Sequence, residues 1–275
     1  AISWNWFGDN PLPLHLLNIV LYGITGIVLF NFCYLLFPNL IFSFVASMLF
    51  MFHPVHTEVV ANIKSVDETL SFLQCISACI FLIRYVQTKN IKSLVLTSVC
   101  FFAALLSKES SITFLAIFLL LILLKSDKKA TSFNWSEVLR PMLTLAVFAL
   151  IFLMIRHSVL SKIASGDPSI ADNLLMAAKS YDQKFATAVL ILGMYLKLLF
   201  IPHPLVFDYS YNQIPLVGIG NMWFILSLLI HTGLLIWAIL IWKKNKLLSF
   251  TVLFYFISMS IYSNIFYMIG SSFGE

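Results

Sequence analysis

Ionisable side chains are concentrated in one short connection between two apolar stretches, "MLFMFHPVHTEVVANIKSVDETLSF" (residues 48–72). The residues that carry them are His53, His56, Glu58, Lys64, Asp67 and Glu68. Imidazole, carboxylate and ammonium groups make the hydrogen bonds that can hold a phosphate and an attached sugar. The pattern therefore favours a phosphate-binding site at the membrane surface. An ordinary solvated loop whose polar residues cap helix starts is the alternative.

The spacing of His53 and His56 also resembles a pair of metal ligands on one helical face. The stronger signature, H-E-x-x-H, is absent from the sequence. Hydrogen bonding to a phosphate and its sugar explains the two histidines better, so we predict no metal site. The cysteines lie inside apolar runs and are expected to be small packing residues: Cys33, Cys75, Cys79 and Cys100.

Ionisable and aromatic residues recur at three further places beside apolar runs. "LLSKESS" places Lys108 next to Glu109, "FLMIRHSVL" contains Arg156, and "VFDYSYNQIP" supplies Asp208 and Tyr209. Adjacent charges between long apolar runs are unfavourable unless they meet water or groups of opposite charge. Snorkelling and an aromatic belt explain such residues individually. Their convergence on one membrane face is the arrangement of an enzyme that takes a phosphate-containing lipid, or of a transporter gate.

The composition indicates which elements must position these side chains. Of the 275 residues, 60% are hydrophobic and 11% are charged. In a typical soluble domain about a quarter of the residues are charged. Its apolar runs are close to the roughly 20 residues that cross a bilayer as a helix. We predict an all-α polytopic membrane protein, a single membrane domain with about eight or nine hydrophobic helices, some short or re-entrant. The runs are 14–37, 39–52, 69–86, 93–106, 111–124, 139–155, 185–201, 222–242 and 248–266.

Lysine and arginine predict the orientation of these helices. The basic connections "RYVQTKNIK", "KSDKK" and "KKNK" are expected on the cytoplasmic side. Counting spans outward from them places residues 53–68, 107–111 and 157–182 on the opposite side. The net charge of +5 therefore reflects topology and not a nucleic-acid surface. The same count requires 185–201 to lie in the interface or to re-enter the membrane.

Four motifs occur in an order that resembles the transmembrane-and-TPR O-mannosyltransferases and their bacterial homologues, within the GT-C glycosyltransferase superfamily. They are "HPVHTEVVANI", "LLSKES", "DYSYNQIPLV" and "YSNIFYMIGSSFGE". The resemblance implies a GT-C-like membrane domain that uses a polyprenyl- or dolichyl-phosphate-linked sugar, often mannose, as donor. The acceptor is a hydroxyl of an exported protein on the extracytoplasmic side. Because the motifs look closer to bacterial members, we expect the bacterial inner membrane, with the site facing the periplasm.

The resemblance also implies roles for the candidate residues. Those beside the lipid phosphate and its sugar would be His53, His56, Glu58, Asp67 and Glu68. The cations that neutralise the phosphate would be Lys64, Lys108 and Arg156. Glu109 would fix Lys108, and Asp208, with Tyr209 beside it, would contact the sugar or the acceptor.

The family implies a general base, an acidic residue of the first extracytoplasmic loop, in a single inverting displacement. That loop precedes "NPLPLH", so we expect the base before Ala1, with Asp9 the only nearby acid, and the chain to be an internal fragment without TPR repeats. The family also usually shows "GRAD" or "GRDE" where this chain has "KSVDE". These departures favour a second hypothesis, a catalytically degenerate GT-C-like subunit that binds lipid or scaffolds a membrane complex. A transporter fits the composition but not the order of the motifs.

Overall fold

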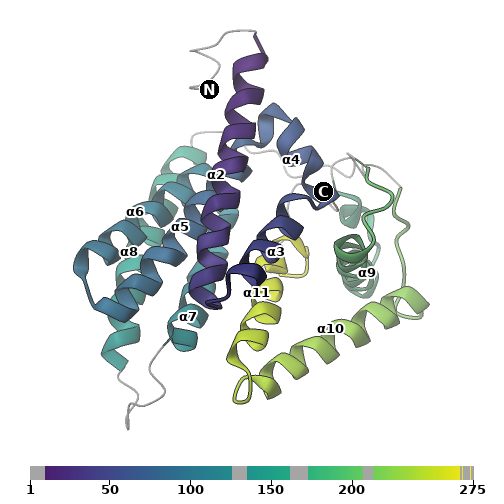
Figure 1. Cartoon of the computed structure of the whole chain (residues 1–275). Coiled ribbons are helices and arrows are strands. Elements are labelled where there is room, and N and C mark those ends of the chain that lie inside the picture. Colours follow the sequence, from purple (N-terminus) through teal and green to yellow (C-terminus); the bar gives the residue numbers. More distant parts are fainter. Residues whose placement is uncertain are drawn as a thin grey trace. The chain divides into compact units, whose positions relative to one another are not determined.

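The computed structural model describes residues 10–125, 135–161, 173–206, 213–266, 268 and 273. Throughout these ranges the regular secondary structure is helical (Figure 1), which confirms the predicted all-α class. The chain divides into two compact units, Ala1–Ser161 and Lys162–Glu275. Whether they act as the single membrane domain expected from the sequence stays a prediction.

The described part of the chain contains helices that are long and apolar enough to cross a membrane. Five qualify alone, and a sixth span results if the bent pair Leu40–Met51 and Pro54–Ala61 is one broken crossing. The pair bends by 50°, as expected where Pro54 interrupts a helix. These helices confirm an integral membrane protein.

The first unit consists of α2 (Leu12–Leu36), α3 (Leu40–Met51), α4 (Thr57–Ala61), α5 (Val66–Thr88), α6 (Ile91–Ser107), α7 (Phe114–Lys125) and α8 (Trp135–Leu160). Short 3-10 helices join them: η1 (Pro54–His56), η2 (Ile63–Ser65) and η3 (Glu109–Thr113). Helix α5 is the central element because it packs against α2, α6 and α7. Its neighbours interlock through aromatic rings, as where Phe101 and Phe118 meet edge to face with centroids 5.2 Å apart.

Asparagine side chains start many of the described helices. The side-chain oxygens of Asn39, Asn90, Asn221 and Asn245 each accept a hydrogen bond from a backbone N–H in the first turn of the following helix. These N–H groups have no partner inside the helix, so the cap stabilises each start. Asparagine therefore marks helix boundaries in a sequence whose apolar runs are nearly continuous.

Helices α2 and α5 run in the same direction, which sorts the connections of the first unit into two ends. Near the start of both helices, the Thr69 hydroxyl donates a hydrogen bond to Asn18 Oδ1 over 3.0 Å. Helix α6 returns, so Lys108 at its end comes back beside the start of α5. We call this the polar end of the first unit: residues 52–68, 108–113 and the C-terminal turns of α8.

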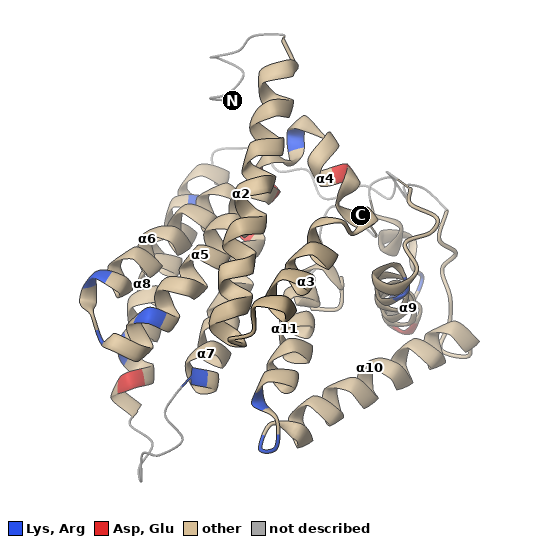
Figure 2. Ribbon diagram, in the orientation of Figure 1, with Lys and Arg blue, Asp and Glu red and all other residues tan. Residues whose placement is uncertain are grey.

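The opposite end, where α5 is followed by α6 and α7 ends, we call the basic end: residues 84–92 and Lys125. Figure 2 shows lysine and arginine at the α5–α6 turn and at the end of α7. An ion pair between Lys89 and Glu137, 3.0 Å long, joins this turn to the start of α8. The basic connection at residues 84–92 therefore lies at one end of the first unit, and the connections that contain both acidic and basic residues lie at the other end.

The second unit contains η4 (Leu174–Ala177), α9 (Tyr181–Phe200), α10 (Met222–Ile241) and α11 (Lys246–Tyr262). Helix α9 has the length and composition of a span, but Figure 1 shows it nearly end-on while α10 lies across the view. The two helices thus cross steeply, unlike successive spans of a bundle. This crossing suits the interfacial or re-entrant placement expected for 185–201, which stays a prediction.

Candidate functional site

The polar end of the first unit gathers predicted site residues from three separate segments. The start of α5 carries Asp67 and Glu68, the junction of α6 and η3 carries Lys108 and Glu109, and the C-terminal part of α8 carries Arg156. These segments lie far apart in the sequence, so only the packing of α5 against α6 and of α6 against α8 brings them together.

Lys108 is held between two carboxylates at the first turn of α5. Its Nζ lies 2.7 Å from Glu68 Oε1 and 3.5 Å from Asp67 Oδ2. Carboxylates are favourable there because the N-terminus of a helix carries a partial positive charge. The side chains remain accessible, with 34% of Lys108, 44% of Asp67 and 34% of Glu68 exposed. An exposed ion pair contributes little stability, so an incoming phosphate can compete for the ammonium group.

Arg156 forms the second ion pair of the polar end. Its Nε donates to Glu109 Oε2, which joins α8 to η3. The pair is also open to solvent, since 40% of the arginine and 60% of the glutamate side chain are exposed. The sequence predicts that Glu109 fixes Lys108; in the structure Glu109 holds Arg156. Two of the three cations assigned to the phosphate, Lys108 and Arg156, thus each contact a carboxylate.

The two histidines lie side by side at the end of α3, with ring centroids 6.2 Å apart. His53 Nδ1 accepts a hydrogen bond from the Val55 N–H and so starts η1. The His56 ring packs 4.3 Å from the centroid of Phe50 and 6.1 Å from that of Tyr22. Burial in this connection, which lies outside the five long spans, and, to a lesser extent, the neighbouring His53 together lower the pKa of His56 to about 4. A neutral His56 can both donate and accept a hydrogen bond at pH 7.

Asn18 positions this connection, and we did not predict it from the sequence. The side chain is fully buried in α2, and its Nδ2 donates to the carbonyls of Val59 and Val60 over 2.7 and 2.9 Å. Its Oδ1 accepts from Thr69, so one amide ties α4 and α5 to α2. The available signal was an isolated amide inside the apolar run "LHLLNIVLY", since such a group is unfavourable in a membrane unless it is hydrogen-bonded.

A pair of serines holds η3 in the same way. Ser71 of α5 and Ser111 of η3 share a hydrogen bond of 2.6 Å between their hydroxyl oxygens, and both side chains are buried. Ser111 also donates to the Ala104 carbonyl over 3.1 Å. The polar end therefore combines backbones fixed by buried hydrogen bonds with charged side chains that face solvent.

The remaining predicted residues lie in α4 and η2 or outside the described ranges. Glu58 lies half-buried in the first turn of α4, and Lys64 is exposed in η2. Asp9, Asp208 and Tyr209 lie outside the described residues. Within the described ranges, no group of three or more His, Cys, Asp or Glu side chains is arranged to hold a metal ion.

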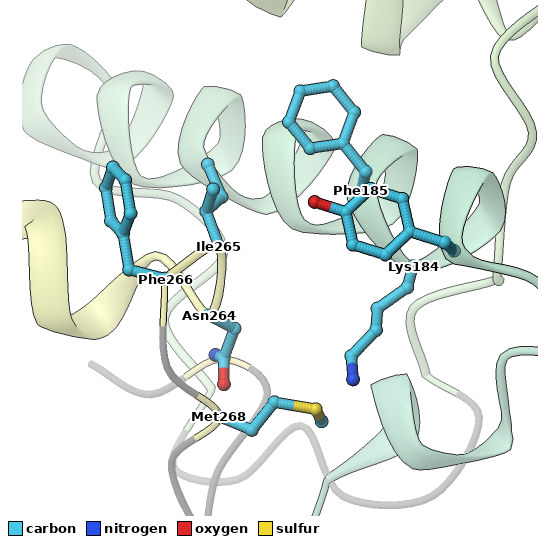
Figure 3. Close-up of a pocket in the computed structure, with 7 residues that line it drawn as sticks. Lys184, Phe185, Asn264, Ile265, Phe266 and Met268 are labelled. Carbon is cyan, nitrogen blue, oxygen red and sulfur yellow. The ribbon is translucent and has the colours of Figure 1, made fainter.

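The second unit has a pocket of its own, with a volume of about 220 Å³, at the start of α9. Figure 3 shows the Lys184 side chain extending toward Met268, with Asn264 on the other side of the opening. Asn264 has a φ of 56°, a left-handed conformation that asparagine adopts more readily than most residues. Asn173 Nδ2 donates to Asn264 Oδ1 over 3.1 Å. The pocket combines one cation with amide and apolar groups.

Comparison with known proteins gives relatives of one kind. The chain is 33% identical over 110 residues to the protein O-mannosyl-transferase Tmtc1 of Drosophila melanogaster, and this match covers 40% of this chain and 13% of that protein. It is 29% identical to a protein O-mannosyl-transferase of Caenorhabditis elegans across 100% of this chain and 38% of that protein. It is 26% identical to the protein O-mannosyl-transferase TMTC4 of Mus musculus across 96% of this chain and 41% of that protein.

The chain is similar to protein O-mannosyl-transferases along its whole length. These matches confirm the predicted resemblance to this group, at low identity. The chain spans about two fifths of the length of the two relatives that it matches from end to end. No protein-family model matches it, and no solved structure matches it significantly.

Proposed function

We propose that this chain forms a membrane domain of a GT-C-type glycosyltransferase. The enzyme would transfer a mannose-like sugar from a polyprenyl-phosphate donor to a hydroxyl of an exported protein or glycan. The observation that carries the proposal is the match to O-mannosyl-transferases along the whole chain. The polar end supports it, because cations and carboxylates meet there at the end of apolar helices.

In the proposed reaction the acceptor oxygen attacks the anomeric carbon of the sugar. The bond from that carbon to the phosphate oxygen breaks, and the lipid phosphate leaves with the electron pair. Lys108 and Arg156 exchange their carboxylate partners for the phosphate and stabilise its charge as it leaves. The acceptor proton passes to an acidic residue, which the family resemblance assigns to a loop that precedes "NPLPLH".

The orientation follows from the basic end. Lysine and arginine are enriched in cytoplasmic connections, so the polar end would face the extracytoplasmic side. On the basis of the motif resemblance, we place the protein in the bacterial inner membrane, with the site open to the periplasm. Lipid-linked donors are then reached from the outer leaflet and exported acceptors from the aqueous side.

The proposal is tested with membranes that contain the full-length protein, including the loop that precedes "NPLPLH", together with a labelled polyprenyl-phosphate-mannose and an acceptor peptide rich in serine and threonine. The wild-type protein should transfer label, and Arg156→Gln should lower the rate about tenfold or more, because it removes a charge-assisted contact to the phosphate. Lys92→Gln is the matched control, since it removes an exposed cation at the opposite end. Full activity of Arg156→Gln would show that Arg156 does not contribute to the site, and no transfer by the full-length wild-type protein would contradict the enzyme hypothesis.

One observation favours the second candidate, a catalytically degenerate subunit that binds lipid or scaffolds a complex. Lys108 and Arg156 already have carboxylate partners, so their charges are compensated without a substrate. Such a subunit would retain the lipid donor in a binding assay and transfer no sugar. Measuring donor binding beside transfer therefore separates the two candidates.

A further inference from the structure

A second cavity lies at the basic end of the first unit, between α2 and α5. Its volume is about 330 Å³. The polar lining residues are Asn31 and Tyr34 of α2 and Ser77 and Arg84 of α5, and the apolar lining includes Val28 and Ile80. Ser77 lies seven residues before Arg84, so the cavity extends about 10 Å along the helices at a rise of about 1.5 Å per residue. The cavity is therefore elongated, with both polar and apolar walls.

Arg84 is the cation of this cavity. Its guanidinium carbon lies 5.7 Å from the centroid of the Phe81 ring, a distance at which a cation and an aromatic face attract each other. Among the residues that the structure describes, no ion pair joins Arg84 to a carboxylate. Two neighbouring cations are occupied, because Lys89 pairs with Glu137 and Lys125 Nζ donates to the Leu35 carbonyl over 2.6 Å. Arg84 is thus placed to bind an anion that enters the cavity.

We propose that this cavity binds the headgroup of an anionic glycerophospholipid. Arg84 contacts the phosphate, and the Tyr34 hydroxyl and the Asn31 amide lie on the facing wall, where they can bond the glycerol or ester oxygens. Basic pockets between membrane helices on the side of the basic loops suit such lipids. The proposal concerns the opposite end from the proposed donor site and does not depend on sugar transfer.

The surroundings of the cavity distinguish a lipid from a free phosphate ion. On α2, Ile24 and Ile27 are 42% and 65% exposed, which gives acyl chains an apolar surface beside the polar lining. A soluble phosphate would use only the polar lining and leave the apolar wall unoccupied. A ligand with a charged head and an apolar continuation matches both parts.

The test compares phosphatidylglycerol with phosphatidylcholine in nanodiscs or by native mass spectrometry of the purified protein. The wild-type protein should prefer phosphatidylglycerol, and Arg84→Gln should reduce this preference about tenfold, the effect expected for one charge-assisted hydrogen bond. Lys92→Gln removes a charge near the same end without lining the cavity, and should retain the preference. Arg84→Lys keeps the charge and should retain a weaker one.

Ser77→Leu provides a second variant, because it fills the cavity while it keeps every charge and suits a membrane helix. This variant should bind phosphatidylglycerol more weakly, while its thermal unfolding should match that of the wild-type protein. An unchanged preference in both Arg84→Gln and Ser77→Leu would contradict the proposal. Equal loss in Lys92→Gln would indicate general surface attraction and overturn it, as would full competition by millimolar inorganic phosphate, which would assign the cavity to a soluble anion.

Discussion

The two ends of the first unit place their cations in opposite ways. At the polar end, Lys108 and Arg156 each contact a carboxylate and are open to water. At the basic end, Arg84 lies against an aromatic ring and lines a cavity with hydroxyl and amide groups. An anion must therefore displace a carboxylate at the polar end, whereas at the basic end no carboxylate of the described residues pairs with Arg84.

This difference suits two kinds of ligand. Exchange between a carboxylate and a phosphate is nearly balanced in free energy when the ion pair is exposed, so a substrate can bind and leave at the polar end. A cation without a carboxylate partner holds an anion for longer, which fits a structural lipid. The comparison predicts that a substrate binds and leaves at the polar end and that a lipid stays bound at the basic end.

The largest effect is expected from Asn18→Leu. The change leaves the carbonyls of Val59 and Val60 and the hydroxyl of Thr69 without the amide that pairs them. We expect the free energy of unfolding to fall by about 2 kcal/mol and activity at the polar end to be lost. Thermal unfolding in detergent and the transfer assay measure the two quantities.

Asn31→Leu is the matched control, because it makes the same substitution on the same helix at the opposite end. The Asn31 amide bonds only within α2 in the contacts described, to the Ile27 carbonyl, and the side chain is exposed. This variant should weaken phosphatidylglycerol binding and leave transfer intact. Equal effects of the two substitutions on transfer would show that the two ends are not independent.

A smaller effect on stability is expected when the residues at positions 109 and 156 are swapped by mutation. Each single variant, Glu109→Arg or Arg156→Glu, should lower stability by less than about 1 kcal/mol, because the pair is exposed. The double variant should restore that stability. It should not restore transfer, because an arginine on η3 no longer reaches the phosphate from α8. Recovery of both quantities in a double-mutant cycle would show that the pair is structural only.

Much of the fold was predictable because apolar runs and asparagine caps are local signals. The run at 222–242 becomes Met222–Ile241, and the run at 69–86 becomes Val66–Thr88. The run at 111–124 was only partly right: its first turn is the 3-10 helix Glu109–Thr113, and the α-helix begins at Phe114. The run at 139–155 was too short, since α8 extends from Trp135 to Leu160 with Pro141 inside it.

The site was less predictable because its geometry depends on which helices are neighbours. Lys108 and Glu68 are distant in sequence, and no local pattern gives their 2.7 Å contact. The assignment of Arg156 to Glu109 likewise depends on α8 packing against α6. Asn18 was missed although its isolated amide was visible in the apolar run, because the backbone carbonyls of Val59 and Val60 that it binds leave no mark in the sequence.

The smallest effect is a dependence on pH that should distinguish the ends. The described histidines of the first unit all lie at or near the polar end: His15, His53, His56 and His157. The pKa of His56 is lowered from 6.5 to about 4 in the folded protein. As the pH falls, the unfolded chain therefore takes up this proton first, and the free energy of unfolding decreases between these two values. Above the unfolded pKa the contribution of His56 is fully present.

His56→Phe should abolish this part of the pH dependence, because phenylalanine keeps the contacts with Phe50 and Tyr22 and cannot be protonated. Thermal unfolding between about pH 7 and about pH 5 measures the change, and His157→Phe, at an exposed position of α8, is the control. The lipid preference of the Arg84 cavity should stay constant over the same range, because arginine remains charged. If acid weakened lipid binding and His56→Phe left the stability profile unchanged, the titrating group would not lie at the polar end, and the physical distinction between the two ends would fail.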